Sequence, residues 1–176
     1  MIFGEVSVPG AFLIEPEAMA DERGFFARTF CVREFEAHGL NPRLAQCSTS
    51  FNRRAGTLRG MHWQAAPHRE AKLVRCTAGA IYDVIIDLRS GSPAYKRWFA
   101  AELTAANRRM LYIPEGCAHG FQSLVDDSEV FYQISAFQAP DAAQGVRWDD
   151  PAFGVEWPSA DRIISARDRS YPNFAG

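Results

Sequence analysis

Short strand-like runs separated by turn signals are the feature that most constrains the fold of this chain. Residues 80–88 are the clearest run, because alternate apolar side chains such as Val84 and Ile86 fall on one face. Alternation with a period of two is the pattern of a β-strand. Strands at such short spacing, with turns between them, predict an all-β sandwich or barrel. Three further runs are predicted to be strands: residues 97–103, 110–113 and 129–137.

Helical signals are few. Residues 31–38 predict about two turns of helix, with Val32 and Phe35 on one side and Gly39 as the terminator. No stretch of 12 or more residues keeps helical periodicity, which argues against a doubly wound parallel sheet, since that plan needs several helices. We expect one domain over residues 1–176, with the tail from residue 149 onward wrapping the body as loops.

Composition excludes several classes of protein. The 176 residues carry 19 basic and 21 acidic side chains, whereas a nucleic-acid-binding protein usually shows a basic surplus. No apolar run approaches the roughly 18 residues of a membrane span, and the N-terminus lacks the features of a signal peptide. The cysteines at positions 31, 47, 76 and 117 form no Cys-x-x-Cys pair and are interpreted as free thiols. We therefore expect a cytoplasmic protein without nucleic-acid or membrane partners.

Three of the four histidines lie in or directly after two glycine-bearing segments, residues 56–64 and 114–121. The second segment contains Pro-x-Gly-x-x-His, ending at His119, which resembles half of the cupin signature. In the first, His62-x-Gln64 stands where a metal-binding cupin carries His-x-His. Two histidines in two such turns indicate a functional site.

Three interpretations of these histidines remain open. His62, His119 and Glu70 could form a metal site with two histidines and one carboxylate, but Gln64 is a poor ligand in place of the expected histidine. Both histidines could instead be hydrogen-bonded residues of a β core. A metal-free acid/base pocket is favoured, because histidine titrates near neutral pH and suits proton abstraction. We therefore expect neither a metal nor another cofactor.

A histidine base needs an orienting partner, commonly a carboxylate on the other ring nitrogen. Asp83, Asp87 and Asp168 are the candidates. Asp83 projects from a strand face that also carries apolar residues, so it should be paired. The residues alone leave open whether it is catalytic or the structural partner of an arginine or lysine.

Cationic side chains near the two segments suggest a polar, anionic substrate. Lys72 lies ten residues after His62, across a predicted hairpin, and a lysine there could stabilise a developing enolate oxygen. Arg23, Arg59 and His119 supply cationic or donor groups for a diphosphate.

These residues make the chain resemble the family of dTDP-4-dehydrorhamnose 3,5-epimerases, also called RmlC. The resemblance implies a jelly-roll cupin with short peripheral helices, which dimerises through its sheets and uses no metal. It also implies a nucleotide-diphospho-4-keto-6-deoxyhexose as substrate, whose C4 ketone acidifies the protons at C3 and C5. The resemblance rests on ordered blocks along nearly the whole chain: DERGFF (21–26), TLRGMHWQ (57–64), AKLV (71–74), DVIIDLR (83–89), IPEGCAHGF (113–121), WDDP (148–151) and ISARD (164–168).

The resemblance implies a role for each of several residues. It implies that His62 is the catalytic base and that Asp168 is its carboxylate partner. It also implies that Lys72 lies near the 4-keto oxygen and that Tyr132 is the acid on the opposite face. The substrate-binding set falls on Arg23, Arg59 and His119 for the phosphates, Arg167 for a further contact and Gln46 for the nucleobase.

The chain departs from the family pattern at the nucleotide end. Arg28 and Ala143 stand where many members have Glu, Gln138 stands where they have a stacking Tyr, and residues 46–52 differ in register. Because cytosine N3 accepts a hydrogen bond where thymine N3 donates one, Arg28 and Gln138 suggest a CDP-linked substrate in place of a dTDP-linked one. The sequence also leaves open epimerisation at C3 or C5 alone, a metal-dependent cupin, and a sugar-nucleotide-binding module without catalysis.

Overall fold

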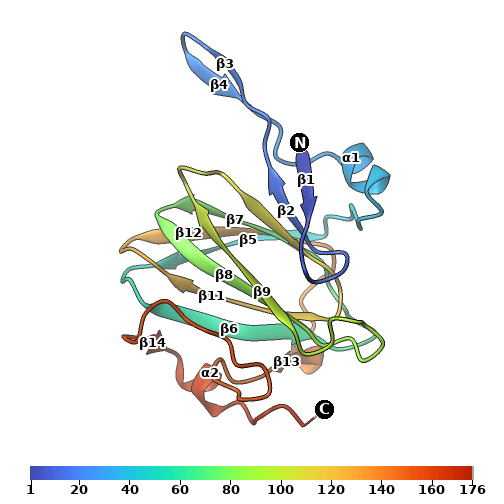
Figure 1. Ribbon diagram of the computed structural model, residues 1–176, viewed down its shortest axis with the longest axis vertical. Coiled ribbons are helices and arrows are strands. Elements are labelled where there is room, and N and C mark those ends of the chain that lie inside the picture. Colours follow the sequence, from blue (N-terminus) through green and yellow to red (C-terminus); the bar gives the residue numbers. More distant parts are fainter. Residues whose placement is uncertain (176) are drawn as a thin grey trace.

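Two stacked antiparallel sheets form the body of the protein, as the computed structural model shows for residues 1–175 (Figure 1). The strand order is β1-β2-β10-β7-β12-β5 in the first sheet and β13-β6-β11-β8-β9 in the second, with β14 pairing in parallel with β6. The prediction of an all-β jelly roll with short peripheral helices is confirmed.

The first sheet consists of β1 (Ile2–Glu5), β2 (Phe12–Glu15), β10 (Met110–Ile113), β7 (Lys72–Ala78), β12 (Ser128–Ile134) and β5 (Gln46–Asn52). The second consists of β13 (Ala143–Gly145), β6 (Thr57–Gln64), β11 (Cys117–Ser123), β8 (Ala80–Asp87), β9 (Trp98–Thr104) and β14 (Ile163–Ile164). A separate hairpin and the helices complete the fold: β3 (Met19–Asp21), β4 (Gly24–Phe26), α1 (Val32–Ala37), η1 (Pro140–Ala142) and α2 (Ala166–Ser170).

The strands predicted from alternation are present, and β10 has the predicted bounds. β12 ends at Ile134, before the predicted residue 137, where it pairs with Gln46 and Lys72, the first residues of its partner strands β5 and β7. Helix α1 lies inside the predicted residues 31–38 and buries Phe35. No helix among residues 1–175 has the length and apolar character needed to cross a membrane.

Strand β8 is buried on both of its faces. Ile81 and Ile85 belong to the core between the two sheets. Val84 and Ile86 face the other way and pack in a second cluster that includes Phe153 from the C-terminal segment. Each fully buried aliphatic side chain contributes about 1.5–3 kcal/mol relative to an exposed one, so the C-terminal segment stabilises the sheet that it covers.

Two expectations about chain connections are wrong. The tail beyond residue 149 is not only loop, because it adds strand β14 to the sheet and forms helix α2. Lys72 does not lie across a hairpin from His62, because β6 belongs to the second sheet and β7 to the first. The two side chains therefore come from opposite walls of the sandwich.

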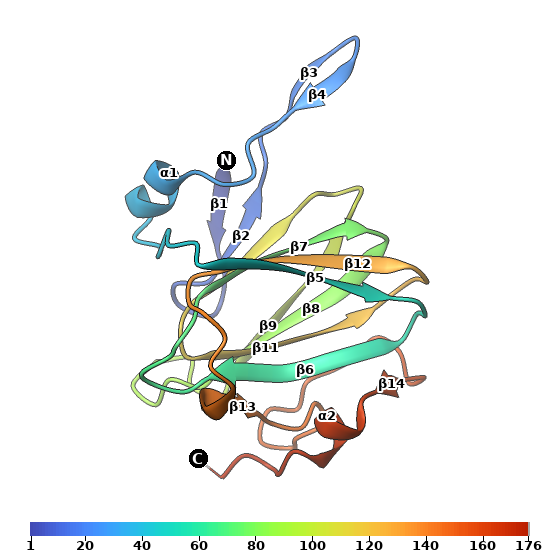
Figure 2. The same ribbon diagram turned by 180° about the vertical axis from the view of Figure 1, so that it is seen from behind.

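The β3–β4 hairpin projects away from the sandwich, on the side opposite the C-terminal segment (Figures 1 and 2). Met19, Phe25 and Phe26 are exposed on it, with relative exposures of 65%, 46% and 68%. The hairpin of this chain therefore presents three large apolar side chains to solvent.

Candidate active site

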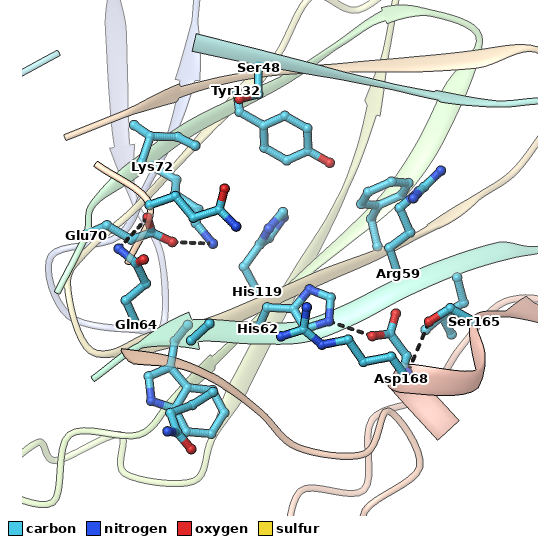
Figure 3. A pocket seen from close by; sticks show the side chains of 18 of the residues that line it. Ser48, Arg59, His62, Gln64, Glu70, Lys72, His119, Tyr132, Ser165 and Asp168 are labelled. Atoms are coloured by element: carbon cyan, nitrogen blue, oxygen red, sulfur yellow. Dashed lines mark hydrogen bonds and ion pairs between the residues drawn. The ribbon is translucent and has the colours of Figure 1, made fainter. Parts of the chain in front are cut away.

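A cavity of about 610 Å³ opens between the two sheets. The first sheet contributes side chains from β5, β7 and β12, and the second from β6, β11, β13 and β14, with further residues from α2. Figure 3 shows that the polar side chains of these elements point toward one another. The predicted site residues that line the cavity are Gln46, Arg59, His62, Lys72, His119, Tyr132, Gln138, Arg167 and Asp168.

His62 on β6 is paired with Asp168 on α2. Nε2 of His62 lies 2.7 Å from Oδ1 of Asp168, and because a carboxylate only accepts hydrogen bonds, Nε2 carries the proton. Nδ1 is thus the nitrogen left free to accept a proton. Of the three candidate carboxylates, the structure brings Asp168 to His62.

The Asp168 carboxylate is itself held in place. Ser165 caps α2 by accepting the N–H of Asp168 at 3.0 Å, and the Gly60 N–H donates to Oδ2 at 3.3 Å. Burial acts to raise the pKa of Asp168, but the hydrogen bonds from His62 and Gly60 outweigh it and hold the pKa below its ordinary value. The carboxylate therefore stays ionised at neutral pH and orients the imidazole.

His119 forms a second histidine–carboxylate pair beside the first. It lies opposite His62 in the register of β11 and β6, and its Nε2 lies 2.7 Å from Oδ1 of the fully buried Asp83. Oδ2 of Asp83 has no hydrogen-bond partner among the described residues. Asp83 therefore partners a histidine, not the arginine or lysine of the structural alternative. Asp87, the third candidate, pairs with Arg89 at 2.7 Å, outside the cavity.

Glycines allow β6 and β11 to approach closely at this point. Gly60 has a φ of +139°, and a Cβ there would lie 2.5 Å from the Cα of Gly120. The register of the two strands shifts between His119 and Phe121. Side chains at Gly60 or Gly120 would separate the strands and, with them, the two histidines.

Tyr132 and Lys72 come from the opposite sheet. The Tyr132 hydroxyl lies 3.1 Å from Ser50 Oγ, and its ring centroid lies 6.1 Å from that of His119. Burial raises the pKa of the Tyr132 phenol, so the hydroxyl stays protonated at neutral pH. The Lys72 ammonium lies 3.0 Å from Glu70 Oε1. A proton donor and a cation thus face the two histidines.

Three further predicted residues are fixed by neighbours along the cavity. Arg59 Nε donates to Asn52 Oδ1 at 2.8 Å. Arg167 Nε donates to the Tyr171 hydroxyl at 2.9 Å. Gln46 Oε1 accepts the backbone N–H of Gln138 at 3.1 Å.

Arg23 and Arg28 are not brought into the cavity of their own chain. The Arg23 side chain is 85% exposed at the tip of the β3–β4 hairpin and pairs with Asp21. Arg28 pairs with Glu34 at 2.8 Å, close to the N-terminal ammonium. Neither residue is among those that line the cavity of its own chain.

Glu70, the carboxylate considered for a metal site, is committed to other partners. Its two oxygens bind Lys72 and Gln64, although Nδ1 of each histidine is left free by the Nε2 contact with its own carboxylate. In residues 1–175, no group of three or more His, Cys, Asp or Glu side chains is arranged to hold a metal ion. The donor set does not fit the two-histidine, one-carboxylate site.

Sequence reasoning misses several residues of the cavity. It suggests Glu70 only as a metal ligand, and it does not reveal that Asp83 pairs with His119. It also gives no sign of Tyr171, whose ring centroid lies 5.8 Å from that of His62. Helix α2 carries its own signal, because Ser165 followed three residues later by Asp168 matches a helix N-cap pattern.

Comparisons with a family model and with known proteins point to the same family. A family model described as dTDP-4-dehydrorhamnose 3,5-epimerase matches residues 5–176. A protein of that name from Sinorhizobium fredii is 38% identical over 175 residues, which cover 99% of this chain and 90% of the relative.

Solved structures agree with the sequence comparison. The dTDP-4-dehydrorhamnose 3,5-epimerase from Bacillus anthracis, crystallised with TDP and PPi, has a TM-score of 0.94 and 38% identity, over 98% of this chain and 99% of that one. ChmJ, a 3'-monoepimerase from Streptomyces bikiniensis in complex with dTDP-quinovose, has a TM-score of 0.87 and 34% identity. The match covers 96% of this chain and 85% of ChmJ.

Proposed function

Because this chain belongs to the family of dTDP-4-dehydrorhamnose 3,5-epimerases, we propose that its cavity epimerises dTDP-linked 4-keto-6-deoxyhexoses. The protein is thus an isomerase of the dTDP-rhamnose type. One observation carries the assignment of residues: an oriented imidazole, His62, and a protonated phenol, Tyr132, line one cavity from opposite sheets. That arrangement suits proton removal from one face of a carbon and proton return to the other.

The reaction requires one proton transfer on each side of the sugar. Nδ1 of His62 takes the proton from C3 or C5, and the electrons of the C–H bond form an enolate with its charge on the C4 oxygen. Tyr132 then gives its proton to the same carbon from the opposite face, and the carbonyl re-forms. The resulting imidazolium and phenolate return to their starting states by proton exchange with solvent.

Charged groups around the cavity match the remaining parts of the substrate. The Lys72 ammonium stabilises the enolate oxygen, an effect worth about 10²–10³ in rate for one well-placed donor. Arg59 and Arg167 bind the diphosphate, since guanidinium N–H groups form charge-assisted hydrogen bonds with phosphate, whereas the Nε2–H of His119 is bound to Asp83. A nucleotide-sugar substrate and four free cysteines support a cytoplasmic location.

Solvent-deuterium NMR tests this function. Incubated in D₂O with a dTDP-4-keto-6-deoxyhexose, the enzyme is expected to incorporate deuterium at C3 and C5, because both carbons lie next to the ketone. Deuterium at a single carbon would instead support a C3- or C5-specific epimerase. Absence of exchange with dTDP-, CDP- and GDP-linked substrates, in a protein that remains folded, would contradict the proposal.

A CDP-linked substrate is the weaker candidate. It depends on Arg28, whose guanidinium is engaged by Glu34 outside the cavity of its own chain. Gln46 and Gln138 lie at the cavity, and an amide offers both a donor and an acceptor to either pyrimidine. The same assay, run with the dTDP-linked and the CDP-linked sugar, gives kcat/KM for each, and the higher value identifies the preferred substrate.

A homodimer is part of the proposal, because Arg23 can contact a substrate only in the cavity of a second copy. The exposed aromatic side chains of the hairpin support such an interface. We expect light scattering to give the mass of a dimer and Arg23→Ala to raise KM. A strict monomer at micromolar concentration would contradict the dimer.

Mixed dimers test whether Arg23 crosses the interface. His62→Ala and Arg23→Ala are each expected to impair activity, so the two proteins are unfolded, mixed and refolded together. If Arg23 acts in the partner's cavity, each mixed dimer contains one cavity with both residues intact, and activity rises above that of either parent. No gain in activity would mean that Arg23 does not act across the interface.

A further inference from the structure

The Lys72 side chain is held by an acidic residue that the mechanism above does not use. Glu70 lies two residues before Lys72, and residues two apart in an extended chain point to the same side. Glu70 Oε1 lies 3.0 Å from Lys72 Nζ, and the two side chains are only 10% and 12% exposed. This pair of charges is largely removed from water, on the wall of the catalytic cavity (Figure 3).

Gln64 fixes the other oxygen of the Glu70 carboxylate. Its Nε2 donates to Glu70 Oε2 at 3.1 Å, and its Oε1 accepts the Ala139 N–H at 2.6 Å. Gln64 is buried on β6 of the second sheet, whereas Lys72 begins β7 of the first. The chain of contacts Gln64–Glu70–Lys72 therefore links the two sheets and leaves the carboxylate little freedom to move.

We propose that Glu70 is a positioning residue that holds the Lys72 ammonium where the C4 oxygen of the substrate develops charge. This inference rests on the proposed function. Lysine has a flexible four-carbon stem, so a charge partner fixed from a second direction restricts the positions of its ammonium. Glu70 also balances the charge of Lys72, since an unpaired ammonium in a cavity wall is costly. Glu70 acts through Lys72 and takes no proton from the substrate.

A double-mutant cycle tests this role. Glu70→Gln keeps the shape of the side chain but removes its charge. We expect kcat to fall roughly ten- to a hundredfold, because misplacement of a catalytic group by about 1 Å can cost a factor of that order. KM should change by less than about twofold, because Glu70 does not itself contact the substrate. In a Lys72→Ala background, Glu70→Gln should change kcat by less than about twofold. Additive losses, or an unchanged kcat in Glu70→Gln, would overturn the proposal.

Two controls keep the test decisive. Asp87→Asn removes another buried, salt-bridged carboxylate, outside the cavity, and should lower thermal stability without changing kcat per folded molecule. Glu70→Ala provides a second variant with the same expected non-additivity, should Glu70→Gln fail to fold. Wild-type exchange in D₂O is measured alongside, because its absence would refute the proposed function, whereas additive losses in an active enzyme would refute only the role of Glu70.

Discussion

Replacement of His62 by asparagine is expected to lower the rate of solvent-deuterium exchange into the substrate by a factor of about 10² to 10⁴, the usual cost of losing a general base. The physical reason is that His62 is the imidazole whose Nε2–H is bound to an ionised carboxylate, leaving Nδ1 as the proton acceptor. NMR of the substrate in D₂O measures the exchange, and circular dichroism verifies that the variant is folded.

Two further variants define the result for His62. Asp168→Asn should cause a smaller but still large loss, because an amide can set the wrong tautomer of the imidazole. His68→Asn is the matched control, since that side chain is exposed and does not line the cavity. Exchange within a few-fold of the wild-type rate in His62→Asn would exclude His62 as the base.

Tyr132→Phe is expected to separate the two halves of the reaction. Burial raises the pKa of Tyr132, so the phenol is protonated at neutral pH and able to donate. Without the hydroxyl, His62 still removes and returns a proton on its own face, so exchange with retained configuration should survive better than net epimerisation. We expect net epimerisation to fall by about 10² to 10⁴. Comparing deuterium incorporation with the appearance of the epimer measures both halves.

Tyr112→Phe is the matched control for Tyr132. Tyr112 is a buried tyrosine of the same sheet, its pKa is also raised by burial, and its hydroxyl accepts the Asn41 N–H outside the cavity. Its loss should affect stability and leave both rates per folded molecule unchanged. If Tyr132→Phe lowered exchange and epimerisation equally, Tyr132 would serve binding or enolate stabilisation instead.

Local patterns were sufficient for much of the fold and for the identity of many cavity residues. The alternation in residues 80–88 predicts β8 because a strand places successive side chains on opposite faces whatever surrounds it. His62 and His119 stand in motifs whose spacing is visible in the chain, and the structure places both on the cavity. The end of β12 at Ile134 could not be predicted, since it coincides with the first residues of two partner strands from distant segments, Gln46 and Lys72.

The carboxylate partner of His119 was decided only by the tertiary structure. Residue types and spacing leave Asp83, Asp87 and Asp168 as equivalent candidates, and the resemblance singles out Asp168 alone. Packing pairs the three with His119, Arg89 and His62 respectively. The short separation of Lys72 from His62 along the chain predicts a hairpin that is absent, because the segment after β6 crosses to the other sheet.

The amino-acid sequence by itself determined the strands, the family and the types of side chain available for proton transfer, because periodicity and motifs are local properties of the chain. The tertiary structure alone decided that Asp83 pairs with His119, that Glu70 and Gln64 hold Lys72, and that Arg23 lies outside its own cavity. The physical reason is that ion pairs and hydrogen bonds act over a few ångströms, and the contacts of His62 with Asp168 join residues 106 positions apart. Such distances depend on how the two sheets and the C-terminal segment pack.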